Sequence, residues 1–594
     1  MHGHADYPFE EEEEGSGRIR YRRTFRRLAG LLRGRWKEIV VASLFLAVAS
    51  AANLAGPVIL RHAIDVDLAA RNAPGLLRTL GVFFLATAAS GVFTYLLRVA
   101  LETLGQDILF ELKKRIFSHL LSLGLGYFDK TPVGRITARV EADTGELRGL
   151  FADTAVLIFR DVGMFVGMFA VMASVHAGLT LVMAALLPPV IAASIVFVRK
   201  SAAPFVSVRR LTAEISATLT ERIQGMAVIQ AYNRQQDSAC VLASLNKRKF
   251  DVNFRAEAMA VYFFVSVLAL EPVAMALILG LGGRWALQGT VTIGTLVMFI
   301  LYVEQVFEPI FHITEHLGTI QRSFAAGARI FDLLDTQRSI ADPPMPRFLG
   351  RIEHAVEFRG VSLRYSEDAP WALRDVSFAV PKGSRLALVG ETGGGKTSIV
   401  SLLFKFYLPQ EGDILIDGVS ISCMSQAGLR QLMGLVQQDI YLFPGTVMDN
   451  LKLMDRRVPD CRVHDAIRTL GLEAVCRRIA LDREVIERGA NLSTGEKQVL
   501  SLVRAMVLDP DLLVLDEATS SVDPHTERTI QAAMERLMTD RTSIVVAHRL
   551  STVRNAHRIL VVRQGRVAES GAHAELMRKG GVYSKLFRLQ FSDS

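Results

Sequence analysis

The sequence predicts two parts of different fold class: an α-helical domain with six membrane spans, followed by an α/β domain in which strands alternate with helices. Three observations predict this division. Half of the 594 residues are hydrophobic (50%), which is high for a soluble protein. The long apolar runs all begin before residue 320. After residue 350, short apolar strands alternate with helical patterns, as in folds built on a parallel sheet.

Each apolar run has about the length of a membrane-crossing helix, which needs about 20 residues to span a bilayer. A buried soluble core could contain one such run, whereas six of them indicate a domain that crosses the membrane repeatedly. The runs cover approximately residues 39–60, 76–97, 155–175, 178–198, 259–281 and 291–312.

The distribution of lysine and arginine predicts the orientation of these spans. Nine basic residues lie in the segment 18–37, before the first span, while the connections at 175–178 and 283–290 carry almost none. Because basic flanks stay on the cytoplasmic side, we expect the N-terminus there, and six spans return the chain to that side. The net charge of +8 fits flanks that touch anionic lipid, and nothing indicates nucleic acid as a partner.

A proline-rich stretch, DTQRSIADPPMPRFLG at 335–350, ends the helical pattern and predicts a boundary between domains. The expected organisation has four parts. They are a cytoplasmic N-terminal segment (1–36), a transmembrane domain with two long intracellular loops (37–335), a linker (336–350) and an α/β domain (351–594).

The motif GETGGGKT at 390–397 lies between an apolar strand and a helical pattern, so it opens a helix at an end where the dipole favours anions. Its glycines let backbone N–H groups surround phosphate oxygens, Lys396 neutralises the β- and γ-phosphates, and the Thr397 hydroxyl reaches Mg²⁺. The segment predicts an ATP-binding P-loop. Its candidate binding residues are Gly390, Glu391, Thr392, Gly393, Gly394, Gly395, Lys396, Thr397 and Ser398.

A second motif, LLVLDE at 512–517, is an apolar strand that ends in two carboxylates, for which we expect different roles. Asp516 can hold Mg²⁺, directly or through water, and Glu517 is placed to polarise the attacking water. An acidic pair that only closes a strand would not explain the P-loop upstream at the right distance. The two motifs together predict ATP hydrolysis.

Residues from about 350 to the end resemble the nucleotide-binding domain of ATP-binding cassette (ABC) transporters, an α/β P-loop domain with a helical subdomain. The resemblance gives roles to further residues of this chain. Tyr365 matches the aromatic residue that stacks on adenine. Gln438 matches the glutamine that links Mg²⁺ and the water to the membrane domain, and His548 matches the switch histidine on the γ-phosphate.

The resemblance also implies a dimer, because several matched residues act across a subunit interface. In the signature NLSTGEKQ, Ser493 and Gly495 match the loop that contacts the γ-phosphate held by the opposite subunit. Asp523 matches a loop that crosses the dimer, and Glu487 matches the segment that contacts the partner's coupling helix. One chain therefore carries two halves of different sites.

The signature departs from the family pattern at Thr494, Glu496 and Lys497, where glycine, glutamine and arginine are usual. A carboxylate about 6 Å from a triphosphate charge, at an effective dielectric of about 20, is repelled by roughly 3 kcal/mol. The affected site is the partner's, which this loop completes. A heterodimer with a second half-transporter is therefore favoured, and a homodimer stays open.

Two polar stretches, 100–150 and 200–255, are far longer than ordinary loops and have helical periodicity. They resemble the intracellular loops of ABC exporters, whose short coupling helices dock on the nucleotide-binding domains. We expect the first coupling turn near residues 139–146 and the second near 230–233. Two cytoplasmic hairpins with another partner are the alternative.

Together these features predict ATP-driven export or flipping of a hydrophobic or amphipathic substrate (drug, lipid or peptide) across the bacterial cytoplasmic membrane by alternating access. An ATP-regulated channel or sensor subunit is the alternative, which degenerate carboxylates at 516–517 would have favoured. Glu271 and Glu304 fall inside predicted spans, where carboxylates are costly and mark functional sites. Both are candidates to contact a cationic substrate or a proton; the alternative for Glu271 is that it pairs with an arginine of another helix or faces the aqueous cavity.

Overall fold

The computed structural model describes residues 17–337, 340–516, 524–547 and 553–591. The chain divides into two compact units. The first comprises Met1–Leu121 and Val133–Thr336, and we call it the membrane unit; the second comprises Ser122–Pro132 and Gln337–Ser594, and we call it the nucleotide unit. The main division lies between residues 336 and 337.

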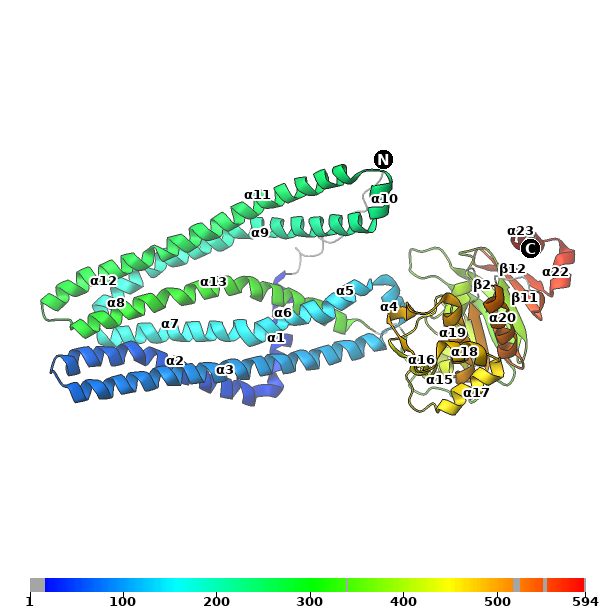
Figure 1. The fold of residues 1–594 in the computed structure, drawn as a ribbon, viewed down its shortest axis with the longest axis horizontal. Coiled ribbons are helices and arrows are strands. Elements are labelled where there is room, and N and C mark those ends of the chain that lie inside the picture. Colours follow the sequence, from blue (N-terminus) through cyan, green and yellow to red (C-terminus); the bar gives the residue numbers. More distant parts are fainter. Residues whose placement is uncertain (1–16, 338–339, 517–523, 548–552, 592–594) are drawn as a thin grey trace. The chain divides into compact units, whose positions relative to one another are not determined.

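The membrane unit is entirely helical in its described part (Figure 1). Its long helices occupy the positions of all six expected spans, and by length and apolar composition four helical segments of the described residues qualify as membrane-crossing. The α-helices are α1 (Gly17–Leu32), α2 (Trp36–His62), α3 (Ala73–Ser122), α5 (Val133–Ala138), α6 (Thr144–Gly149), α7 (Ala155–Val175), α8 (Ala177–Ala185), α9 (Leu187–Gln224), α10 (Met226–Ala231), α11 (Gln235–Leu268), α12 (Leu270–Leu287) and α13 (Ile293–Asp335). Short 3-10 and π-helical turns join some of them: η1 (Arg33–Arg35), η2 (Ala63–Leu68), η3 (Arg139–Asp143) and η4 (Leu150–Thr154).

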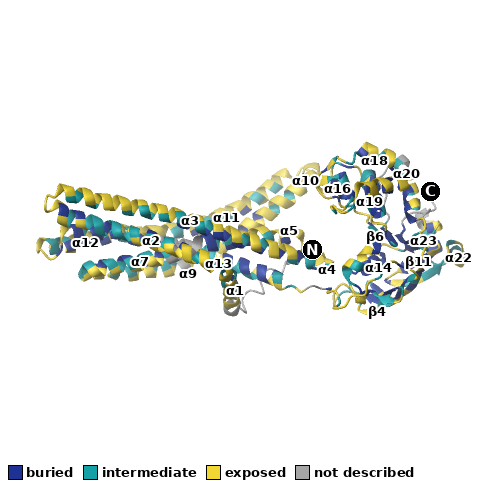
Figure 2. Cartoon of the chain, turned by 90° about the horizontal axis from the view of Figure 1, so that it is seen from below, coloured by how far each residue is buried: buried dark blue, intermediate teal, exposed yellow. Residues whose placement is uncertain are grey.

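Helix α13 lies at the centre of the membrane unit and packs on α2, α7 and α12. Its residues Phe299, Tyr302 and Val303 are completely buried, and the Tyr302 hydroxyl donates a hydrogen bond of 2.6 Å to the backbone carbonyl of Leu54 on α2. Elsewhere large apolar side chains on the long helices face outward, where Figure 2 shows extended exposed surface. In a membrane-crossing helix such side chains meet lipid tails, so their exposure costs nothing.

The nucleotide unit contains three sheets. A six-stranded sheet has the order β12-β11-β3-β10-β9-β6, a four-stranded sheet has the order β2-β1-β4-β5, and β7 pairs with β8. The strands are β1 (Ala355–Leu363), β2 (Leu373–Pro381), β3 (Arg385–Val389), β4 (Glu411–Ile416), β5 (Val419–Ser420), β6 (Met433–Val436), β7 (Gly445–Thr446), β8 (Glu484–Val485), β9 (Leu512–Asp516), β10 (Thr542–Val546), β11 (Arg558–Arg563) and β12 (Arg566–Gly571).

Two large apolar cores stabilise this unit. One lies between the two larger sheets and α14, and the other holds the helical subdomain, formed by α16 to α19, together with α20 against β9. The helices are α4 (Leu125–Lys130), α14 (Lys396–Leu403), α15 (Gln426–Gln431), α16 (Val447–Leu451), α17 (Asp460–Leu470), α18 (Glu473–Ile479), α19 (Thr494–Leu508), α20 (Pro524–Met538), α22 (His573–Lys579) and α23 (Val582–Phe591), with turns η5 (Ile421–Cys423) and η6 (Glu487–Gly489). The predicted fold class, a helical transmembrane domain followed by an α/β P-loop domain with a helical subdomain, is confirmed in its architecture. The count of six spans stays a prediction, with which the helices are compatible.

The short helix α4 belongs to the nucleotide unit, although it comes from the first long intracellular loop. Its Asp129 carboxylate accepts a hydrogen bond from the Tyr407 hydroxyl. Gly126 lies so close to the same ring that an added Cβ would meet Tyr407 at 3.2 Å. Gly124 lies directly before α4, and Pro132 lies two residues after its end. Both residue types interrupt helices, which explains why α4 is short.

The expected position of the first coupling turn, residues 139–146, is therefore wrong. These residues lie in η3 and α6 of the membrane unit, where they pack on α13. Asp143 accepts hydrogen bonds of 2.6 and 3.1 Å from Arg329, and the Glu146 carbonyl accepts one of 2.8 Å from Ser323. Polar groups satisfied within the membrane unit are not available for docking on the nucleotide unit. The second expected turn, 230–233, falls at the end of α10, and its docking stays a prediction.

Candidate functional site

The six-stranded sheet brings together the loops that follow its parallel strands. Val546 on β10 lies beside Leu388 on β3 and Asp516 on β9, and Val436 on β6 lies beside Leu515. The carboxyl ends of these four strands therefore meet at one edge of the sheet. Ligands of open α/β sheets bind at this edge. The P-loop, Asp516 and Gln438 all lie at this edge.

The P-loop is closed by glycines at positions where a side chain does not fit. Gly395, directly before α14, has φ +111°, and an added Cβ would lie 2.9 Å from the Ala372 carbonyl and 2.8 Å from the Leu373 side chain. The space at Gly390 is tighter, because an added Cβ there would lie only 2.1 Å from the Val562 carbonyl oxygen. The loop can take this shape only with glycine at both positions.

Lys396 is the buried cation of the P-loop, with 7% of its surface exposed. Its ammonium donates hydrogen bonds of 2.7 and 2.9 Å to the carbonyls of Gly390 and Glu391. Burial lowers the pKa of Lys396, and the nearby Asp516 carboxylate opposes that shift. A buried ammonium has three donors and is costly without anionic partners, so this position fits a bound phosphate.

Tyr365 is held at the P-loop by its hydroxyl, which forms a hydrogen bond of 2.9 Å with the buried Ser398. Its ring also meets the edge of Tyr407 at 4.9 Å between centroids. Tyr365 is 40% exposed, which leaves ring surface for a flat ligand. Burial, and then the Asp129 carboxylate, raise the pKa of Tyr407 well above its ordinary range, so its hydroxyl stays a donor. Contacts thus run from Ser398 to α4 through two tyrosines.

Three side chains with oxygen ligands lie at the same sheet edge. Thr397 is exposed at the start of α14, Asp516 is half-buried at the end of β9, and Gln438 is exposed two residues after β6. Mg²⁺ is usually bound by one or two carboxylates together with substrate phosphates and waters. The donor set therefore fits Mg²⁺ carried by a nucleotide.

The signature loop lies in the other core of the unit, that of the helical subdomain. Ser493 is the N-cap of α19, where its hydroxyl accepts from the Glu496 N–H at 3.2 Å. Glu496 reciprocates, because its carboxylate accepts from the Ser493 N–H at 2.9 Å. This capping box gives Glu496 a local structural role. The Lys497 ammonium donates a hydrogen bond of 3.0 Å to the Arg488 carbonyl. Gly495 is buried in the first turn of α19.

The remaining candidates fall into two groups. Glu517, Asp523 and His548 lie outside the described residues. Glu487 is exposed in the turn η6, in keeping with a surface segment.

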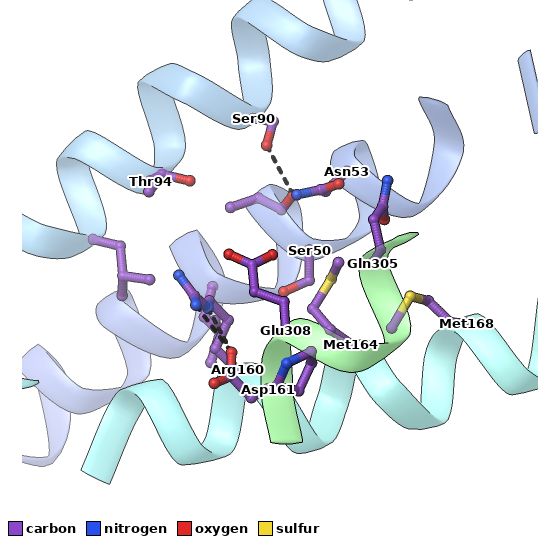
Figure 3. A pocket seen from close by; sticks show the side chains of 14 residues that line it. Ser50, Asn53, Ser90, Thr94, Arg160, Asp161, Met164, Met168, Gln305 and Glu308 are labelled. Carbon is purple, nitrogen blue, oxygen red and sulfur yellow. Dashed lines mark hydrogen bonds and ion pairs between the residues drawn. The ribbon is translucent and has the colours of Figure 1, made fainter. Parts of the chain in front are cut away.

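Sequence reasoning missed a polar pocket in the membrane unit, formed by α2, α3, α7 and α13 (Figure 3). Asp161 and Glu308 line it, whereas the carboxylates singled out from the sequence, Glu271 and Glu304, do not. The usable signal was the charged pair Arg160 and Asp161 inside an apolar run.

The fold and the site define a P-loop ATPase fused to a helical membrane domain. Two family matches agree with this class: residues 39–310 match the family model described as ABC transporter transmembrane region, and residues 373–520 match the one described as ABC transporter. The chain belongs to the ABC transporter family, as a fused exporter that uses ATP hydrolysis for transport. It is a protein of the bacterial inner membrane.

Relatives of known sequence and structure place the chain among the exporters. It is 36% identical over 507 residues to a probable multidrug resistance ABC transporter ATP-binding/permease protein of Bacillus subtilis, covering 84% of this chain and 74% of that protein. It is 30% identical over 590 residues to the ATP-dependent lipid A-core flippase of Bordetella avium, covering 96% and 97%. A solved bacterial Atm1-family ABC exporter with ATP bound matches with a TM-score of 0.78 and 28% identity, over 94% of this chain and 98% of that one.

Proposed function

We propose that this chain is one half of a dimeric exporter that moves a hydrophobic or amphipathic molecule out of the cytoplasm. The observation that carries the proposal is the sheet edge, where the glycine-closed P-loop, the buried Lys396 and Asp516 converge. The named multidrug and lipid A-core relatives support a substrate with apolar surface.

Each residue of the sheet edge takes a role that its surroundings support. Lys396 and the loop N–H groups hold the triphosphate, and the exposed ring of Tyr365 stacks on adenine. Thr397, Gln438 and Asp516 hold Mg²⁺, which neutralises charge on the phosphates. From the sequence alone, Glu517 orients the attacking water and His548 contacts the γ-phosphate.

A complete site requires two chains in this proposal. The P-loop and the signature are held in different apolar cores of the same unit, so the signature of one chain closes on the P-loop of another. At the end of the α9–α11 pair, the α10 segment presents Met226, Val228 and Tyr232 with 41, 61 and 74% of their surface exposed. We assign this apolar tip to docking on the partner's nucleotide unit.

We propose a heterodimer and an orientation with the N-terminus and nucleotide unit in the cytoplasm. The basic segment before the first span supports the orientation. Expression of this chain alone tests the heterodimer. Substrate-stimulated ATPase that appears only on co-expression with a second half-transporter supports it, whereas a homodimer with full cooperative ATPase contradicts it.

Inverted membrane vesicles that contain the assembled transporter test the export function. With ATP outside, wild-type vesicles are expected to accumulate the apolar dye Nile red or to translocate a fluorescent phospholipid, with vanadate-sensitive ATPase. Lys396→Ala removes the buried ammonium and should abolish both signals. Lys382→Ala changes an exposed lysine in the turn after β2 and is the matched control. Transport that persists in Lys396→Ala at the wild-type rate would overturn the proposal.

A further inference from the structure

The pocket of the membrane unit has a volume of about 360 Å³, which lies in the range of small-molecule sites. Helix α13 contributes Gln305, Glu308 and Pro309, and α7 contributes Arg160, Asp161, Met164 and Met168. Figure 3 shows Glu308 reaching from α13 toward the space between α2 and α7, with Met164 and Met168 nearby. The pocket is therefore a cavity with both polar and apolar lining.

The charges of this lining do not cancel. Arg160 is paired with Asp161 at 3.0 Å, and Asp161 is 3% exposed, so this pair is internally balanced. Across the described residues, no basic group lies within ion-pair distance of the Glu308 carboxylate. Among the described residues that line the pocket, one side chain is basic and two are acidic, which gives them a net charge of −1. Glu308 lies inside the span predicted at residues 291–312, where a carboxylate without a counter-ion is a functional candidate.

Gln305, one turn before Pro309, adds a second acceptor. In the described part of the chain, its side-chain Oε1 is buried without a hydrogen-bond partner. Pro309 has no N–H and cannot donate the helical hydrogen bond to the Gln305 carbonyl. A buried acceptor is costly when it stays unpaired, so this stretch of α13 is suited to a ligand that donates.

Apolar atoms surround this acceptor-rich stretch. Met168 is completely buried and Leu97 is 5% exposed, and both line the pocket with Met164 and Leu46. Methionine adapts to ligands of different shape and contacts aromatic rings favourably. The lining thus fits a molecule with one charged group and an apolar or aromatic body.

We propose that this pocket binds an amphipathic organic cation, with the positive charge on Glu308, an N–H donor on Gln305 and the apolar body against the methionines. The inference rests on the proposed export function, whose substrate class it narrows. A simple anion is disfavoured because the pocket's basic group is already paired with Asp161.

Binding of ethidium, a flat aromatic cation with amino donors, tests the site on the full chain in lipid nanodiscs without ATP. Wild-type protein is expected to bind ethidium more tightly than the anionic dye anilinonaphthalene sulfonate, relative to protein-free nanodiscs. Glu308→Gln keeps the shape and removes the charge, so the Kd for ethidium should rise at least tenfold. Glu308→Asp should stay within threefold of wild type, and Glu308→Lys should reverse the preference between the two dyes.

Glu304→Gln is the matched control, since Glu304 lies on the same helix, one turn away, and does not line the pocket. Its ethidium Kd should stay within twofold of wild type. Gln305→Leu removes only the acceptor and should weaken binding about fivefold, which keeps the proposal testable if Glu308→Gln does not fold. Unchanged ethidium binding in either pocket variant, or tighter binding of the anionic dye by wild type, overturns the proposal.

The same measurements separate this inference from the export function. Lys396→Ala should bind ethidium normally while it loses ATP-driven transport, because the pocket lies in the other unit. A chain that transports Nile red or phospholipid but does not bind ethidium retains the function and contradicts the pocket assignment. Ethidium binding without any ATP-driven transport contradicts the function instead.

Discussion

The nucleotide site and the membrane pocket are built in different ways. The nucleotide site comes from loops that directly follow parallel strands, and most of its binding residues occupy one run, 390–398. The pocket is lined by three or four residues from each of four helices, from Leu46 on α2 to Pro309 on α13. A site made by one loop is visible as a motif, whereas a site made by helix packing exists only after folding.

Burial follows opposite rules in the two units. In the nucleotide unit, Leu513 and Val514 of β9 are completely buried, as expected for a strand covered on both faces. In the membrane unit, Phe84 and Leu181 are 71 and 73% exposed. The same apolar side chains are stabilised by protein contacts in one unit and by lipid in the other. The exposed fraction of an apolar side chain can therefore be interpreted only when it is known whether water or lipid surrounds that surface.

The largest effect is expected from Glu517→Gln at the nucleotide site. The substitution keeps size and removes the carboxylate proposed to orient water, so hydrolysis should fall by about 10² to 10⁴ while ATP binding is retained. ATPase rate and binding of a fluorescent ATP analogue measure the two separately. Asp482→Asn, an exposed carboxylate of the same unit, is the control. Turnover within threefold of wild type would show that Glu517 has another role.

The shape of the P-loop can be broken without any change of charge. Gly395→Ala adds a methyl group at φ +111° that meets the Ala372 carbonyl, so affinity for the ATP analogue should fall more than tenfold. Gly418→Ala has a similar positive φ, +78°, but open space around the added carbon. It should cost only about 1 kcal/mol of stability and leave nucleotide affinity unchanged. Equal losses of affinity in both variants would contradict the role of close packing.

The attachment of α4 to the rest of the nucleotide unit can be weakened at Tyr407. Tyr407→Phe removes the hydroxyl that donates to Asp129, and hydrogen bonds to charged groups contribute about 1.5–3 kcal/mol. Since Asp129 is exposed, we expect this bond to contribute an energy at the lower end of that range. The basal ATPase rate should stay within threefold of wild type, and transport per ATP hydrolysed should fall about threefold to tenfold.

Asp129→Asn, alone and combined with Tyr407→Phe, completes a double-mutant cycle. If the two groups act through their hydrogen bond, the double variant should be no worse than either single variant. Additive losses of transport, or unchanged transport in Tyr407→Phe, would show that this hydrogen bond does not couple ATP hydrolysis to transport.

Much of this molecule could be predicted from sequence because its determinants are local. The P-loop, the strand ending at Asp516 and the apolar runs are each set by neighbouring residues. The position of α4 could not be predicted in the same way. Residues 139–146 belong to the membrane unit because Arg329 of α13 donates hydrogen bonds to the Asp143 carboxylate, and this long-range contact is not visible in the local sequence. Glu308 was missed for a related reason, since only packing decides whether Glu304 or Glu308 faces the pocket.

The smallest effect is expected in the signature, where sequence and structure give Glu496 different roles. The sequence suggests repulsion of the partner's nucleotide by roughly 3 kcal/mol, which would correspond to a change in affinity of about 100-fold. The structure shows the carboxylate bound to the Ser493 N–H at the start of α19, where the helix dipole offsets part of its charge.

Glu496→Gln separates the two roles, because glutamine also forms a capping box but carries no charge. We expect affinity at the site completed by this loop to rise by only about threefold to tenfold in the assembled dimer, with little loss of stability. Glu496→Ala removes the box as well and should destabilise α19 by about 1 kcal/mol. Unchanged nucleotide affinity in Glu496→Gln would make Glu496 purely a helix cap, and the proposed heterodimer would lose its main support.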